Sequence, residues 1–126
     1  MFCARFLFYG LLLACLTACV PAGQSQQQKK EQQAEVHYKL GIAHLQGNNP
    51  TLALKELLIA VENGPQNSYV HASLAQAYQR KKAYPLAEKH FLKAIALSEN
   101  DPRYQNNLAS LYLDMEQWDD AIKYFD

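Results

Sequence analysis

From residue 34 onward, apolar side chains recur at steps of three and four residues, as in Leu74, Ala77 and Tyr78. This spacing places apolar side chains along one face of an α-helix. Turn-forming sequences interrupt the pattern, for example the Asn-Asn-Pro sequence ending at Pro50, where proline suits the first position of a helix. The pattern therefore predicts helices over residues 35–47, 51–63, 68–81, 85–98, 103–115 and 118–126.

The helical pattern repeats with a period of 34 residues. When the sequence is shifted by this number, Leu40, Leu74 and Leu108 share one column. Two further columns hold small residues at Gly41, Ala75 and Ala109 and at Ala53, Ala87 and Ala121, and a third holds Leu57, Phe91 and Phe125. A fixed period of this length is typical of stacked helical hairpins. We expect repeats over residues 34–67, 68–101 and 102–126.

These columns resemble the tetratricopeptide repeat. The resemblance implies an all-α fold, an α-solenoid of antiparallel helix hairpins with about 2.7 repeats, because the third is incomplete. The two small columns are expected to face one another, so that the helices of a hairpin approach closely. Large residues are expected to fill the space between hairpins: Tyr78, Phe91, Tyr112 and Phe125. One departure from the family pattern is His44, which stands where a tyrosine is usual.

The third repeat stops at Asp126, within its expected second helix. Several apolar residues are therefore expected to have no following helix to pack against: Trp118, Ala121, Ile122 and Phe125. We expect either that the chain is an incomplete version of a longer protein, or that a partner or a second copy covers this end.

Residues 1–18 have the features of an export signal. Arg5 is followed by an apolar stretch that is short for a transmembrane helix. The stretch ends in Leu16-Thr17-Ala18-Cys19, which resembles the lipobox of bacterial lipoproteins and implies acylation of Cys19, with palmitate among the acyl groups. Cleavage before Cys19 would leave that residue as the one cysteine of the mature chain. The alternative is an ordinary cleaved signal peptide with a chance cysteine.

Residues 19–33 are rich in glutamine and lack apolar periodicity, which predicts a flexible linker whose later half could extend the first helix. Val20 follows the lipobox cysteine, at a position where lipoproteins retained in the inner membrane commonly carry aspartate. The resemblance therefore implies the periplasmic face of the outer membrane.

Charge and composition narrow the possible functions. The 12 basic and 12 acidic residues balance, which argues against a nucleic-acid binder. The sequence contains no phosphate-binding glycine motif, no paired metal-ligand motif and no Ser–His–acid constellation, so we expect no enzyme activity, no cofactor and no metal. We interpret His37, His44 and His71 as inter-helix residues and His90 as a surface residue.

In the tetratricopeptide family the first helix of each pair lines a concave face. The resemblance places a mixed apolar and amide surface there: Tyr38, Ile42, Leu45, Tyr69, Ala72, Gln76, Gln79, Arg103, Asn106 and Ser110. Such a surface suits a peptide segment or helix, with exposed aromatic side chains as anchors. The alternative is that Tyr38 and Tyr69 are simply half-buried helix residues.

Lipobox, linker and repeats together resemble the type IV pilus pilotin lipoproteins, the PilF/PilW/Tgl group, which assist assembly of the pilus secretin in the outer membrane. The resemblance implies a membrane-anchored scaffold whose partner is a protein such as an outer-membrane secretin. Other interpretations are an adaptor for barrel insertion, polysaccharide export or cell-wall synthesis, or the docking module of a longer enzyme. A lipoprotein that self-associates through its uncapped C-terminal end is a further alternative.

Overall fold

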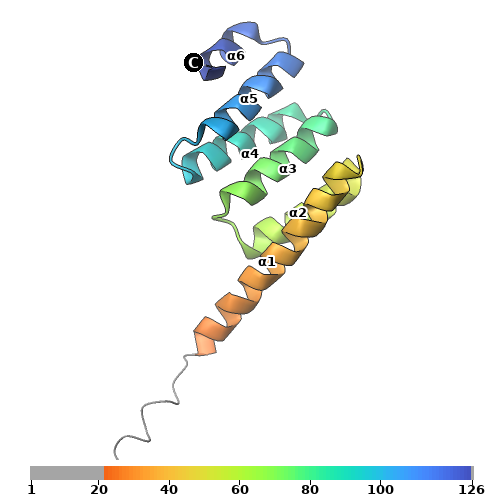
Figure 1. Cartoon of the computed structure of the whole chain (residues 1–126), viewed down its shortest axis with the longest axis vertical. Coiled ribbons are helices and arrows are strands. Elements are labelled where there is room, and N and C mark those ends of the chain that lie inside the picture. Colours follow the sequence, from red (N-terminus) through yellow and green to blue (C-terminus); the bar gives the residue numbers. More distant parts are fainter. Residues whose placement is uncertain (1–21, 126) are drawn as a thin grey trace, which may run out of the picture.

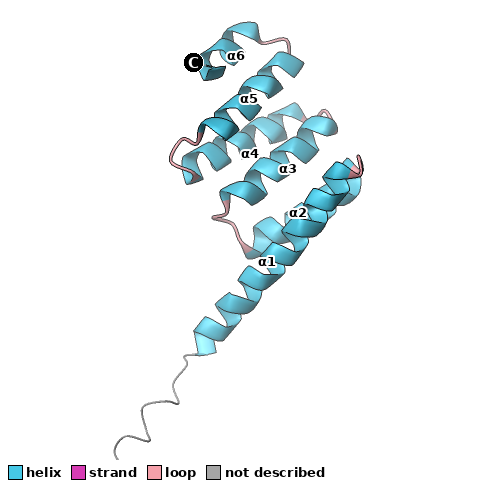
Figure 2. Cartoon of the chain, viewed as in Figure 1, coloured by secondary structure: helices cyan, strands magenta, loops and turns pink. Residues whose placement is uncertain are grey.

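The fold was analysed in a computed structural model that describes residues 22–125. Within that range every regular element is a helix (Figures 1 and 2). The elements are α1 (Ala22–Gln46), α2 (Pro50–Asn63), α3 (Ser68–Arg80), α4 (Tyr84–Leu97), α5 (Pro102–Asp114) and α6 (Trp118–Phe125). From α2 onward these bounds lie within one residue of the predicted ones, so the all-α prediction is confirmed.

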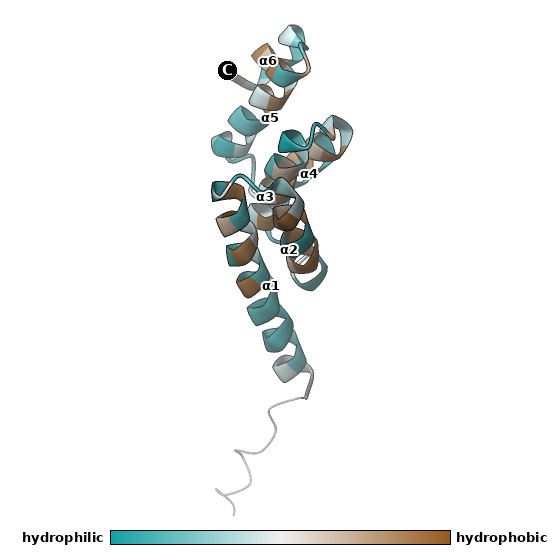
Figure 3. Ribbon diagram, turned by 90° about the vertical axis from the view of Figure 1, so that its right-hand side faces the viewer, coloured by the Kyte–Doolittle hydropathy of each residue, from teal (hydrophilic) through white to brown (hydrophobic). Residues whose placement is uncertain are grey.

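Consecutive helices pair as hairpins, α1 with α2, α3 with α4 and α5 with α6. Each hairpin contacts the next through its second helix, because α2 packs on α3 and α4 packs on α5. The first helices lie along one side of the stack and the second helices along the other (Figure 3). This is the solenoid that the 34-residue period predicts.

Local sequence explains where the helices start. The side chains of Asn49, Asn67 and Asp101 each accept a hydrogen bond from a backbone N–H in the first turn of the following helix. Such caps satisfy N–H groups that have no partner within the helix. Pro50 and Pro102 occupy first helical positions, where the missing N–H has no cost.

The turn inside each hairpin repeats one backbone conformation. Asn48, Lys82 and Glu116 have φ angles of 55°, 59° and 58°, in the left-handed region. Each is followed by a residue whose N–H bonds a carbonyl in the last turn of the first helix, as in Ala83 to Tyr78 at 2.9 Å. The 34-residue period therefore extends to the backbone of the turns.

The core consists of two clusters along the stack. Leu57 and Leu74 are buried in the first cluster, and Phe91 and Leu108 in the second, while Tyr78 packs against both. Phe91 and Tyr112 are buried between hairpins as predicted. Phe125 does not follow that prediction, because it is 53% exposed. Ala121 also differs, since it is fully buried within its own hairpin.

Gly41 lies against Leu57. A Cβ atom added at Gly41 would come within 2.5 Å of the Leu57 side chain. The small-against-small pairing expected from the columns is therefore not what excludes a side chain at this position. A buried leucine of α2 occupies the space instead.

The first helix corrects one prediction. Residues 22–33, expected to be a flexible linker, belong to α1, which runs without a break to Gln46. Most of this extension is glutamine, lysine, glutamate and alanine, which are good helix formers, and the packed part of α1 provides the nucleus. The extension is hydrophilic and projects away from the hairpins (Figure 3). Residues 1–21, with the predicted signal and Cys19, lie outside the described residues.

Candidate protein-binding face

The first helices α1, α3 and α5 present the surface on which the candidate binding residues were predicted. Tyr69, Arg103, Asn106 and Ser110 are exposed on this surface. Tyr38, Ile42, Gln76 and Gln79 are half-buried. The structure therefore places most of the predicted residues where a partner could reach them.

Leu45 is an error of the sequence interpretation. Its side chain is 4% exposed and packs in the core with Ala53, Leu57 and Leu74. Ala72 is likewise buried, in the second cluster. At the end of α1 the exposed position is the next residue, Gln46, so the predicted exposed row was one residue out of phase.

Two columns of the repeat are exposed in all three hairpins and were missed or only partly identified. One holds Glu35, Tyr69 and Arg103 near the starts of the packed first helices. The other holds Gln46, Arg80 and Asp114 at their ends. The sequence contains the signal that finds them, since positions 35, 42 and 46 keep helical spacing on one face.

An aromatic and charged cluster lies at the starts of α3 and α5. The rings of Tyr69 and Tyr104 meet edge to face, with centroids 6.3 Å apart. The Arg103 guanidinium lies 5.9 Å from the centre of the Tyr104 ring and bonds the Asp101 carboxylate at 2.6 Å. Asp101, with a smaller contribution from Tyr69, raises the pKa of Arg103, and the same hydrogen bonds lower the pKa of Asp101. The exposed ring of Tyr69 is thus held beside a permanent positive charge.

The opposite ends of the first helices are connected by polar contacts. The Gln79 side chain donates to Asp114 Oδ2 at 2.6 Å, which links α3 to α5. Arg80 donates to the Leu45 carbonyl at the end of α1, where a cation complements the helix dipole. These contacts hold the row of first helices in a fixed spacing.

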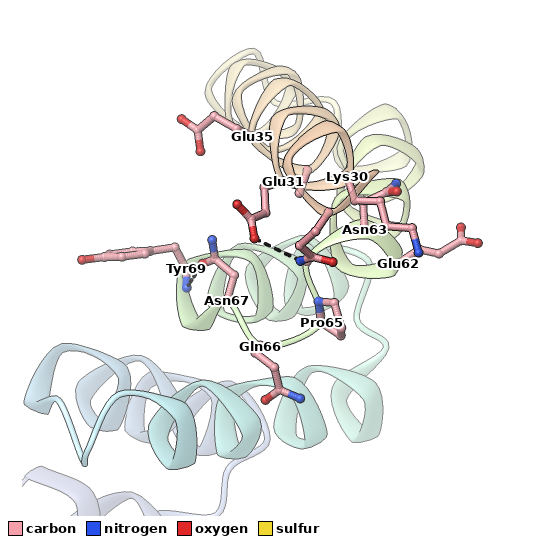
Figure 4. Close-up of a pocket in the computed structure, with 12 residues that line it drawn as sticks. Lys30, Glu31, Glu35, Glu62, Asn63, Pro65, Gln66, Asn67 and Tyr69 are labelled. Atoms are coloured by element: carbon pink, nitrogen blue, oxygen red, sulfur yellow. Dashed lines mark hydrogen bonds between the residues drawn. The ribbon is translucent and has the colours of Figure 1, made fainter. Parts of the chain in front are cut away.

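A cavity of about 750 Å³ lies between the extension of α1 and the turn from α2 to α3 (Figure 4). Glu31 and Asn67 lie along it, while Glu35 and Glu62 extend outward. Glu31 accepts a hydrogen bond from Gln27 at 3.0 Å. Because the sequence interpretation treated this part of α1 as a linker, it did not predict the cavity.

The histidines form contacts between the helices of a hairpin. His37 Nδ1 lies 2.7 Å from Glu56 Oε2, and His71 stacks on His90. His90 is therefore half-buried, which corrects its interpretation as a surface residue. Within residues 22–125, no three His, Cys, Asp or Glu side chains are grouped so as to share a metal ion.

No helix of this same range has both the length and the apolar character needed to cross a lipid bilayer. The described surface consists of amides, exposed aromatics and scattered charges of both signs along parallel first helices. Such a surface suits contact with an extended or helical polypeptide.

Comparison with known proteins supports this interpretation. A family model described as tetratricopeptide repeat matches residues 38–102, and a second model with the same description matches residues 106–126. A curated relative is the type IV pilus assembly protein PilF of Pseudomonas aeruginosa, which is 28% identical over 117 residues. The match covers 90% of this chain and 46% of PilF, so the chain spans about half the length of that relative.

Solved structures share the fold. A structure of Pseudomonas aeruginosa PilF superposes with a TM-score of 0.69 at 25% identity, covering 76% of this chain and 43% of the other. The second tetratricopeptide domain of Spaghetti (RPAP3), bound to an HSP90 peptide, superposes with a TM-score of 0.73 at 22% identity, covering 80% of this chain and 93% of that one. The second likeness shows the fold alone.

Proposed function

The chain belongs to the tetratricopeptide repeat family, a family of protein-interaction scaffolds, and we propose that it assists the assembly or localisation of a type IV pilus secretin. The observation that carries this proposal is the similarity to PilF along 90% of the chain. The partner is a protein, and the first-helix face is where it binds.

The geometry of that face supports a polypeptide ligand. Tyr69 and Arg103 stand one repeat apart, so their side chains form a row across neighbouring helices. A rigid aromatic ring beside a guanidinium is the kind of anchor on which binding energy concentrates. Asn106 and Ser110 continue the exposed surface along α5 with groups that can hydrogen-bond a peptide backbone.

We further propose that Cys19 carries acyl chains that hold the protein on the periplasmic face of the outer membrane. Two or more acyl chains are needed for stable anchoring, because one chain binds only marginally. The helical extension of α1 then acts as a spacer. At about 1.5 Å per residue, residues 22–33 would keep the hairpins roughly 18 Å from the anchored end.

Co-purification tests the partner. The full chain is crosslinked in membranes of its own bacterium and captured, and we expect the secretin to be recovered with it. A Tyr69→Ala, Asn106→Ala variant should lose most of the secretin. The matched control, Lys89→Ala with Lys93→Ala, changes two exposed residues of α4 and should keep it. Absence of secretin from every capture, together with unchanged secretin multimers in a deletion strain, would contradict the proposal.

Cell fractionation tests the anchor separately. Cys19→Ala should move the protein out of the membrane fraction, and a density gradient should place the wild-type protein with the outer membrane. If Cys19→Ala leaves the membrane fraction unchanged, the lipid anchor is wrong. The protein-binding proposal would survive that result.

A further inference from the structure

An apolar row on α1 has no neighbour among residues 22–125. It consists of Val36, Leu40 and Ala43, which we call the head face. Val36 is 56% exposed, Leu40 is 44% exposed and Ala43 is also exposed. Residues at this spacing lie on one side of a helix, and α1 turns them away from α2.

The same columns of the repeat are buried in the other two hairpins. The equivalents are Val70, Leu74 and Ala77 in α3 and Tyr104, Leu108 and Leu111 in α5. In α3 they pack with Leu57 of α2, and in α5 with Phe91 of α4. The head face therefore has the composition of a surface that receives the second helix of another hairpin.

A complementary row is exposed at the opposite end of the stack (Figure 1). Trp118, Ile122 and Phe125 lie on one face of α6, and all three are more than half exposed. We call them the tail face. Their equivalents in α4 are Tyr84, Glu88 and Phe91, which face α5. Phe91 packs beside Leu108, and Glu88 accepts a hydrogen bond from the Tyr112 hydroxyl at 2.6 Å.

We propose that two copies of this chain stack head to tail, with the tail face of one copy on the head face of the next. The occupant of the head face is inferred from continuity with interfaces inside the molecule, where α2 packs on α3 and α4 on α5. A second copy supplies a second helix whose facing residues are all apolar. The proposal does not depend on the secretin assignment.

This contact joins two different surfaces, so each dimer keeps one free head face and one free tail face. Such heterologous contacts can continue into longer assemblies. The contact between copies uses fewer large side chains than the internal interfaces, because α6 ends one residue after it reaches the column of Phe91. We therefore expect association that depends on concentration over the range accessible to sedimentation.

Sedimentation of the full chain in mild detergent tests the proposal. The average mass of the wild-type protein should rise with concentration. Leu40→Glu in the head face and Phe125→Glu in the tail face should each give a single-copy species. An equimolar mixture of these two variants retains one intact head face and one intact tail face, so it should form a heterodimer and nothing larger.

The control is Leu92→Glu, which changes a leucine of α4 with 42% exposure, close to that of Leu40, and should associate as the wild type does. Sharing of one micelle by two lipid anchors would not respond to Leu40→Glu. A wild-type protein that stays a single copy at every concentration overturns the proposal. Association lost in Phe125→Glu but kept in Leu40→Glu also overturns it, because it means tail-to-tail pairing.

Discussion

His71 and His90 stack in the second hairpin at the two positions where His37 meets Glu56 in the first. Their Nδ1 atoms lie 3.0 Å apart, and His71 Nε2 lies 2.9 Å from the Pro65 carbonyl oxygen. A carbonyl accepts only, so neutral His71 carries its proton on Nε2 and His90 donates from Nδ1. Burial, followed by the neighbouring His71 and Lys89, lowers the pKa of His90 to about 4.

This pair makes stability depend on pH in a predictable direction. Burial also lowers the pKa of His71, so the folded protein resists protonation that the unfolded chain accepts below about pH 6.5. The free energy of unfolding should therefore fall as pH decreases from about 6.5 to 4. The slope approaches about 1.4 kcal/mol per pH unit for each proton excluded.

The first hairpin supplies the matched variant. His90→Glu recreates the His–Glu pair, in which a carboxylate favours protonated His71, so the slope between pH 6.5 and 4 should shrink or change sign. Urea denaturation at several pH values measures both proteins. Equal slopes in the two proteins would show that the histidine pair does not control this dependence.

Gly41→Ala should destabilise the protein. The new Cβ atom would lie 2.5 Å from a side chain of fully buried Leu57, so the α1–α2 hairpin must open or Leu57 must change rotamer. Overpacking of this kind costs about 1–3 kcal/mol, which exceeds the gain of about 1 kcal/mol in helix propensity at its upper end. Gly23→Ala is the control, since no atom lies within 4 Å of its added Cβ. A melting temperature unchanged or raised in Gly41→Ala would contradict this account.

Lys82→Gly should stabilise the protein by about 0.5–1 kcal/mol, because glycine adopts the left-handed conformation without the steric cost that a lysine bears there. The adjacent Lys81 has a φ of −82°, so Lys81→Gly should instead destabilise by a similar amount through lost chain entropy. Both lysines are exposed, which limits other effects. Chemical denaturation of the pair decides the matter, and effects of the same sign would refute the conformational explanation.

Tyr112→Phe should cost about 1–3 kcal/mol. The substitution leaves the half-buried Glu88 carboxylate without its donor, and an unsatisfied charged group is expensive to bury. The contact also raises the pKa of Tyr112, after the larger effect of burial. Tyr124→Phe is the matched control, since no hydrogen bond to the Tyr124 hydroxyl is found among the described residues, and thermal unfolding should leave it near the wild type. Equal losses in both variants would argue against the Glu88 contact as the cause.

The sequence alone determined the helices and their order. Apolar residues at steps of three and four fix an amphipathic helix, and the 34-residue period fixes the hairpin as the repeating unit. The capping residues and prolines then set the helix starts to within a residue from α2 onward. These features depend on neighbours that are close along the chain, so a linear pattern contains them.

The tertiary structure decided what depends on neighbours in space. It buried Leu45 and left Gln46 exposed, because the crossing of α1 over α2 and α3 fixes which side of the last turn is covered. It extended α1 to Ala22, since a packed helix nucleates polar residues that form no core of their own. It also brought together His71 and His90, which lie 19 residues apart, and left the head and tail faces uncovered. Burial is a property of the stack, and the period repeats the residues without stating which hairpins have a neighbour on each side.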